Sequence, residues 1–183
     1  MSDALDEAPD DRDDVADQAD QVDPAAAVVA QLDGLGVAYE LVPCDPDLAD
    51  TAAFCAGYGY ALEDSANTIL VAGKADPPRY AACVVLATTR LDVNRTVRQR
   101  LGTRKASFAS ADETRELTGM LLGGVTAFAL PAGLPLWIDA RVLERPRVIL
   151  GAGSRSAKVL VEPAVLSRLP GAEVVDGLAV QPG

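Results

Sequence analysis

The sequence contains no histidine among its 183 residues, which excludes a cysteine–histidine catalytic pair. No run of 18 apolar residues occurs, so a membrane-spanning helix is not expected. The N-terminus is acidic and has no apolar segment, which argues against a secretory signal. The three cysteines, Cys44, Cys55 and Cys83, are irregularly spaced and give neither a disulfide framework nor a zinc signature. We therefore expect a protein of the reducing cytoplasm.

What the chain does contain suits one globular domain. Apolar residues make up 49% of the sequence, and 183 residues are enough for a full hydrophobic core. The net charge of −11 is unevenly distributed: residues 1–23 hold ten acids and one base, whereas the remaining residues hold 17 acids and 15 bases. A run of like charges cannot bury apolar area. We predict an acidic disordered tail over 1–23 and a single domain over 24–178.

Two glycine-rich stretches are the most conspicuous local patterns. The first, residues 123–131, is a glycine pair followed by an apolar loop. The second, residues 151–155, separates two β-type runs at 147–150 and 159–161. Because glycine has no Cβ, it permits positive φ and close backbone approach. Such loops can present backbone N–H groups to a small polar ligand, a phosphate or a developing oxyanion. The alternative is that both stretches are ordinary turns.

Helices and strands alternate along the chain. Asp23 followed by Pro24 predicts the start of a first helix, and Gly34 its end. Ser110 and Glu113 form a capping-box pattern for a helix that ends at Gly119. Apolar runs at 67–72, 80–87 and 136–138 predict strands, and the unbroken run at 80–87 indicates a central one.

A basic segment lies between the predicted central strand and the capping box. Six bases occur within residues 90–105 against a single acid, Asp92, which we expect to cap a helix that ends at Gly102. Three of these bases, Arg90, Arg95 and Arg98, are our candidates for contact with the phosphates of a nucleic acid. Phosphate binding needs local positive charge even on an acidic protein. The alternative is a solvated helix face.

Six short pieces follow one another in an order that carries more information than any one of them. They are residues 65–71, 86–94, 116–119, 123–126, 136–139 and 151–155. In this order they resemble the YbaK/ProX family, whose free-standing and synthetase-appended domains hydrolyse mischarged aminoacyl-tRNA. The resemblance covers residues 36–175. It implies a single α/β domain in which short helices surround a curved, mixed, mainly antiparallel sheet.

The resemblance also implies an activity and partners. The chain would be a trans-acting aminoacyl-tRNA deacylase that hydrolyses the ester of a small amino acid mischarged on tRNA, as in translation quality control. Mischarged aminoacyl-tRNA would be its partner, and association with an aminoacyl-tRNA synthetase is a further expectation. No cofactor, metal or membrane is expected. Substrate-assisted catalysis through a ribose hydroxyl, proposed for the family, would suit a chain without histidine or a strong nucleophile.

Site residues are carried over from the matching motifs. Catalytic candidates are Asn67, Gly124 and Thr126, with the backbone N–H groups of residues 124–126 and 151–154 facing the oxyanion. Substrate-binding candidates are Cys44, Val125, Asp139, Gly151, Ala152, Gly153, Ser154 and Arg155. The carboxylate of Asp139 would hold the substrate's amino group or, as an alternative, cap a helix over 140–143. The planar fork of Arg155 would meet a phosphate or carboxylate.

The chain departs from the family pattern at Asn67, because most of the deacylases it resembles have a lysine there. An asparagine amide carries no charge, although it can donate a hydrogen bond. Lys74 is a candidate stand-in for that lysine. Ala127 replaces a frequent proline and predicts a different pocket shape.

Cys44 would be nucleophilic only if something lowered the pKa of its thiol, whereas Cys55 and Cys83 are typical of core positions.

The uncharged Asn67 also favours a second function. The protein would then bind aminoacyl-tRNA, or a small aminoacyl ligand, without turning it over. A third alternative is hydrolysis or binding of another small aminoacyl ester. Salt-sensitive binding that depends on Arg95 and Arg98 would indicate a nucleic-acid partner.

Overall fold

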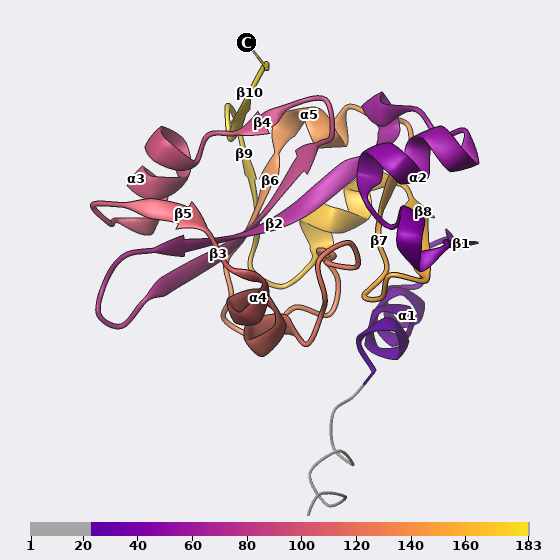
Figure 1. The fold of residues 1–183 in the computed structure, drawn as a ribbon, viewed down its shortest axis with the longest axis horizontal. Helices are drawn as coiled ribbons and strands as arrows, with labels where there is room; N and C mark the ends of the chain where they lie inside the picture. The colour runs from indigo at the N-terminus through magenta and orange to yellow at the C-terminus, as the bar shows by residue number, and fades with distance from the viewer. Residues whose placement is uncertain (1–22, 183) are drawn as a thin grey trace, which may run out of the picture.

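A mixed five-stranded sheet forms the centre of the structure, a computed structural model that describes residues 23–182 (Figure 1). Its order is β5 (Ala106–Phe108), β2 (Ala66–Gly73), β3 (Arg79–Leu86), β6 (Leu136–Asp139) and β9 (Ala172–Val175). β2 runs antiparallel to β3 and β5, whereas β6 runs parallel to β3 and β9. β3 lies in the middle, and its residues from Ala81 to Val85 are at most 1% exposed, which confirms the predicted central strand.

A second sheet lies beside the N-terminal half of β2. It is antiparallel, with the order β1 (Tyr39–Pro43), β8 (Ala157–Val161) and β7 (Val148–Gly151). The pairing of β7 with β8 around the second glycine stretch is as predicted. A single parallel bridge, between Ser65 and Ile149, joins this sheet to the first one. The two sheets therefore separate on either side of that bridge, and the separation leaves room for a cavity.

The predicted fold class, an α/β domain with a mixed and mainly antiparallel sheet, is confirmed. The strands nevertheless divide into three sheets. The third is a small ladder between β4 (Arg90–Leu91) and β10 (Ala179–Val180). The predicted tail over 1–23 lies almost entirely outside the described residues, and the domain boundaries stay a prediction. No helix among residues 23–182 is long and apolar enough to cross a membrane.

Capping residues set the ends of the longer helices. α1 (Pro24–Leu35) begins where Asp23 accepts a hydrogen bond from the N–H of Ala25, as predicted. Its predicted end at Gly34 is wrong, because Gly36 takes the left-handed conformation, with φ at 63°, that terminates the helix. α4 (Ala111–Thr118) has the predicted capping box and ends at Gly119.

The other helices are short. They are η1 (Pro46–Leu48), α2 (Thr51–Tyr58), η2 (Leu62–Asp64), η3 (Val93–Val97), α3 (Arg98–Leu101), α5 (Ala140–Leu143) and η4 (Pro163–Arg168). Asp92 caps η3 through the N–H groups of Arg95 and Thr96, and Gly102 ends α3, as predicted. η3 is a wide π-type turn that leads directly into α3.

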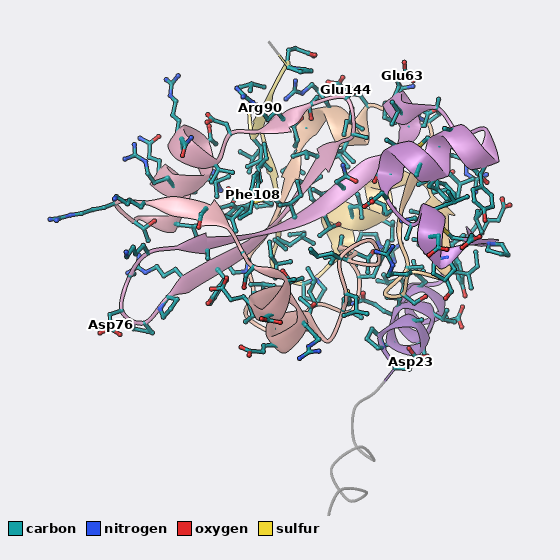
Figure 2. All side chains as sticks on the ribbon, viewed as in Figure 1. Asp23, Glu63, Asp76, Arg90, Phe108 and Glu144 are labelled. Carbon is teal, nitrogen blue, oxygen red and sulfur yellow. The ribbon has the colours of Figure 1, made fainter. Side chains whose placement is uncertain are left out.

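Side chains fill the space between the sheets and helices (Figure 2). The buried apolar side chains form three clusters. The largest lies between the two main sheets and includes Phe128 and Leu136. The second packs α3 against the other face of the central sheet and includes Cys83. The third lies under α2 and includes Phe54 and Cys55. Cys55 and Cys83 are thus core residues, as predicted, and the third cluster supports one wall of the cavity described next.

Candidate functional site

A cavity of about 270 Å³ opens where the two main sheets separate. Four walls surround it: the start of β2, the end of β7, the N-terminus of α2 with the residue before it, and the first glycine loop. Figure 1 shows α2, β7 and β8 gathered at this end of the molecule, with β5 and α3 at the other. The lining residues are Ala49, Asp50, Thr51, Phe54, Ser65, Ala66, Asn67, Thr68, Ile69, Leu122, Gly123, Val125, Ile149, Leu150, Gly151 and Lys158.

On the β2 wall, the backbone N–H and C=O of Thr68 have no partner within residues 23–182. In an antiparallel strand the N–H and C=O of one residue point to the same side, and the side alternates along the chain. The carbonyl of Leu70 accepts from Ala109, on the β5 side, so Thr68 also points away from β3. The pairing with β5 starts only at Val71. The hydroxyl of Thr68 is buried as well, without a hydrogen-bond partner among the described residues.

Asn67 lies on the same wall and faces the start of α2. Its side-chain oxygen accepts a hydrogen bond from the hydroxyl of Thr51 at 2.5 Å. This bond occupies the acceptor end of the amide and leaves the NH₂ group as the end that can donate. The structure therefore brings Asn67 to the cavity, as a neutral hydrogen-bond donor.

Lys158, on β8, is the charged side chain that the analysis of the sequence missed. It is only 6% exposed and lines the cavity. Its Nζ donates to the carbonyl of Ala49 at 2.6 Å and to that of Gly123 at 2.8 Å, and lies 5.7 Å from the centre of the Phe54 ring. Burial lowers the pKa of Lys158 below its ordinary value. The sequence signal that could have identified Lys158 is its position as the one charged residue in the otherwise apolar strand β8.

Arg155 makes a second bridge between the same two walls. Its guanidinium donates to the carbonyl of Leu122 at 2.7 Å and to that of Pro46 at 2.6 Å. Arg155 does not line the cavity, and backbone carbonyls occupy its fork. The structure thus places it behind the walls, where it ties the segment before α2 to the first glycine loop.

The two glycine stretches pack against each other. The N–H of Gly153 donates to the carbonyl of Gly124 at 2.9 Å, and the N–H of Gly124 donates to Leu121. A Cβ on Gly124 would lie 2.6 Å from the backbone carbon of Ser154, so only glycine permits this approach. These two N–H groups are engaged inside the protein, which corrects the expectation that they face a ligand.

The remaining candidates of these stretches divide between cavity and core. Val125 and Gly151 line the cavity, as does Gly123. Ala152 is buried in the largest cluster. Thr126 is fully buried away from the cavity lining, and its hydroxyl has no partner among the described residues.

Cys44 and Lys74 do not reach the cavity. The Cys44 thiol is buried and donates to the carbonyl of Asp45 at 3.3 Å. Burial raises the pKa of this thiol, although the charge of Lys158 opposes the shift, so the thiol form is favoured over the nucleophilic thiolate. Lys74 follows the far end of β2, where its N–H donates to the carbonyl of Lys105.

Among residues 23–182, no three side chains of the metal-binding types lie together.

Asp139 serves as the helix cap, the second of the two alternatives. It is 1% exposed, accepts from the N–H groups of Arg141 and Ala179, and pairs with the Arg141 guanidinium at 2.7 and 2.9 Å. Burial alone would raise the pKa of Asp139, but these hydrogen bonds outweigh it and hold the pKa below its usual value. Both oxygens are occupied, and the residue does not line the cavity.

The basic segment lies at the other end of the central sheet. Arg95, Arg104 and Lys105 are exposed, and Arg98 donates to the carbonyl of Arg104. Arg90 is exposed on β4 (Figure 2). Arg100 is already engaged, because it pairs with Glu173 at 2.5 Å and lies 4.9 Å from the Trp137 ring. The exposed Phe108 on β5 adds an aromatic side chain to this end.

The fold and the cavity define an α/β domain with a small, polar-walled site at the junction of two sheets. Residues 45–169 match the family described as the aminoacyl-tRNA editing domain, and the chain belongs to that family.

Solved structures with the same fold include the hypothetical protein APE2540, with a TM-score of 0.73 and 27% identity over 82% of this chain and 97% of that one. Another is described as a candidate trans-editing enzyme for prolyl-tRNA synthetase, with a TM-score of 0.72 and 23% identity over 89% and 99% of the two chains.

Proposed function

We propose that this protein is a trans-acting deacylase that hydrolyses the ester of a small amino acid mischarged on tRNA. The observation that carries the proposal is a cavity, in an aminoacyl-tRNA editing domain, that is lined by Asn67 and Thr68. The amide NH₂ group of Asn67 can donate, and the backbone groups of Thr68 point away from β3 without a partner among the described residues. Polar groups without internal partners are costly inside a protein and are satisfied when a polar ligand enters.

The size of the cavity supports a small aminoacyl group. Ligand pockets commonly measure about 300–1,000 Å³, and this cavity, at about 270 Å³, lies below that range. Phe54, Ile149 and Leu150 supply apolar surface, which suits a short aliphatic side chain. A larger side chain would be excluded by volume, so a correctly charged large amino acid would be spared.

The arrangement of charge along β2 supports tRNA as the carrier. The cavity lies at Asn67 and Thr68, whereas β5 and the exposed bases lie beside residues 71–73. At about 3.3 Å per residue, the three to six residues of strand between them separate the two by roughly 10–20 Å. A single tRNA could therefore insert its aminoacyl end while its phosphates contact Arg95 and Arg98.

A deacylation assay tests the proposal. The purified protein would be incubated with a panel of correctly charged and mischarged tRNAs, and release of the amino acid would be followed. We expect turnover on at least one tRNA that carries a small wrong amino acid, and loss of rate in Asn67→Ala. Hydrolysis of none of the panel, with no tRNA binding, would contradict the proposal.

A second candidate function is non-catalytic binding of the same ligand. The observation that favours it is the neutral side chain at Asn67, where most of the resembling deacylases have lysine. If only Asn67→Lys hydrolyses the panel while the wild type binds it, the wild type is a binding protein. Turnover by the wild type would exclude that alternative.

A further inference from the structure

Only two charged residues are buried in the part of the chain that the structure describes, Asp139 and Lys158. Asp139 has a charged partner in Arg141. Lys158 has no carboxylate within ion-pair distance among the described residues, and its two hydrogen-bond partners are neutral carbonyls. A buried charge without a counter-charge is costly to a folded protein. This makes Lys158 the group in the cavity that most needs a negatively polarised ligand.

The position of the ammonium suits such a ligand. An ammonium has three N–H donors, and the carbonyls of Ala49 and Gly123 use two of them. Both carbonyls belong to residues that line the cavity, so the nitrogen lies where two of its walls meet. The remaining N–H is available to a third acceptor. The titratable groups around it are the thiols of Cys44 and Cys55, the carboxylate of Asp50, which also lines the cavity, and the guanidinium of Arg155.

We propose that Lys158 is a catalytic residue that donates its free N–H to the ester carbonyl oxygen of the bound aminoacyl group. This inference rests on the deacylase function proposed above. Water adds to the carbonyl carbon, the bond from that carbon to the ribose oxygen breaks, and the ribose oxygen takes a proton from the water. The products are the free amino acid and a tRNA with a free hydroxyl. The carbonyl oxygen gains negative charge during the addition, and a fixed, water-poor cation stabilises that charge.

A purely structural role is the competing explanation, because Lys158 also bridges two walls. Arg155 provides the matched comparison, since it bridges the same two segments through carbonyls but does not line the cavity. If bridging were the whole role, removing either side chain would lower the activity to a similar extent. If Lys158 contacts the reacting carbonyl, its removal costs far more.

The experiment compares Lys158→Met, Arg155→Met and the swap variant Lys158→Met/Asn67→Lys in single-turnover deacylation, with thermal unfolding of each. We expect Lys158→Met to lose about 100-fold or more in rate, the typical effect of removing one oxyanion donor, with tRNA affinity retained. Arg155→Met should lose no more than about tenfold. The swap should regain part of the rate, because it returns an ammonium to the cavity from β2. If Lys158→Met does not fold, Lys158→Gln keeps an amide donor for the two carbonyls without the charge.

Each outcome decides a different point. Equal losses in Lys158→Met and Arg155→Met, with no recovery in the swap, would overturn the assignment of Lys158 and leave the deacylase function standing. A wild type that hydrolyses no tRNA in the panel would overturn both proposals. A large loss confined to Lys158→Met, with recovery in the swap, would establish the ammonium as part of the reaction.

Discussion

The two buried charged residues among residues 23–182, Asp139 and Lys158, lie in regions that differ in how they satisfy the charge. At the end of β6, Asp139 accepts four hydrogen bonds, two from backbone N–H groups and two from the guanidinium of Arg141. At the junction of the sheets, Lys158 has two neutral carbonyls and an aromatic ring. The charge of Asp139 is fully hydrogen-bonded without a ligand, whereas one N–H of the Lys158 ammonium is left for a ligand. The difference separates a charge that holds the fold from one that is available for chemistry.

The Asp139 region should show the largest effect on stability. Asp139→Asn leaves Arg141 without its partner, and breaking a buried pair costs about 3–5 kcal/mol of unfolding free energy. Because the pKa of Asp139 is lowered in the folded state, its contribution is present above the unfolded pKa of about 3.9 and is lost as pH falls through the folded value. Urea unfolding at pH 7 and pH 3 measures both effects.

The exposed ion pair between Arg100 and Glu173 is the control for that measurement. Glu173→Gln should cost less than about 1 kcal/mol at neutral pH. A loss in Asp139→Asn no larger than the loss in Glu173→Gln would refute the structural role assigned to Asp139.

The contact between the glycine loops should give the next largest effect. A Cβ on Gly151 would lie 2.8 Å from the carbonyl oxygen of Gly124, so Gly151→Ala should cost about 1–3 kcal/mol and distort the cavity. Gly34→Ala is the matched control, because it adds the same methyl inside α1, where nothing lies within 4 Å. It should raise the unfolding free energy by up to about 1 kcal/mol. Equal stability of both variants would contradict the close packing of the loops.

Substitutions at two buried threonines, Thr68 and Thr126, should give smaller effects that differ between the cavity and the core. Thr68 and Thr126 both have a buried hydroxyl without a hydrogen-bond partner in the described part of the chain, but of the two only Thr68 lines the cavity. Replacement by valine should raise the unfolding free energy by about 1 kcal/mol in each case, because an unpaired polar group is removed. Thr68→Val should also slow deacylation about three- to tenfold, the value of one lost hydrogen bond to the ligand. A loss of activity in Thr126→Val instead would support the sequence-based expectation for Thr126.

The basic end of the sheet should show the smallest effect per residue. Arg95→Gln with Arg98→Gln should weaken tRNA binding and reduce the slope of log affinity against log salt by about two, one for each phosphate contact. Arg168→Gln is the control, since this arginine is beside α1 and donates to Leu35. If the wild type, the double variant and Arg168→Gln all bind tRNA with the same salt dependence, the basic end of the sheet does not contact the tRNA.

Several helix ends and strands could be predicted from local sequence signals, whereas the mixed sheet was implied only by the resemblance to the YbaK/ProX family. Caps at Asp23, Asp92 and Ser110 and the apolar run of β3 are read within a few residues, and the structure has them where expected. The end of α1 was misplaced because Gly34 and Gly36 are equally plausible stops in the sequence, and only the backbone conformation selects between them.

Less of the site could be predicted from the sequence, because the site depends on contacts between residues that are far apart in the chain. Gly124 and Gly153 mark where one loop packs on the other, so the expectation that their N–H groups face a ligand is wrong. Lys158 lies over 90 residues from Asn67 in sequence, and no local pattern links β8 to β2. Lys74 was the nearer lysine in sequence, yet it lies past the far end of its strand.

The central claim is that the Lys158 ammonium faces the cavity and takes the ligand's carbonyl. The chain has only three lysines, Lys74, Lys105 and Lys158, so ¹³C labelling of lysine side chains gives three signals, and Lys158→Met assigns one of them. A pH titration by NMR would be run with and without a non-hydrolysable, amide-linked aminoacyl-adenosine. We predict that Lys158 titrates below the usual lysine pKa of about 10.4, and that the ligand shifts its signal but not those of the two exposed lysines. A Lys158 signal that titrates like a lysine in water and does not respond to the ligand would contradict the claim.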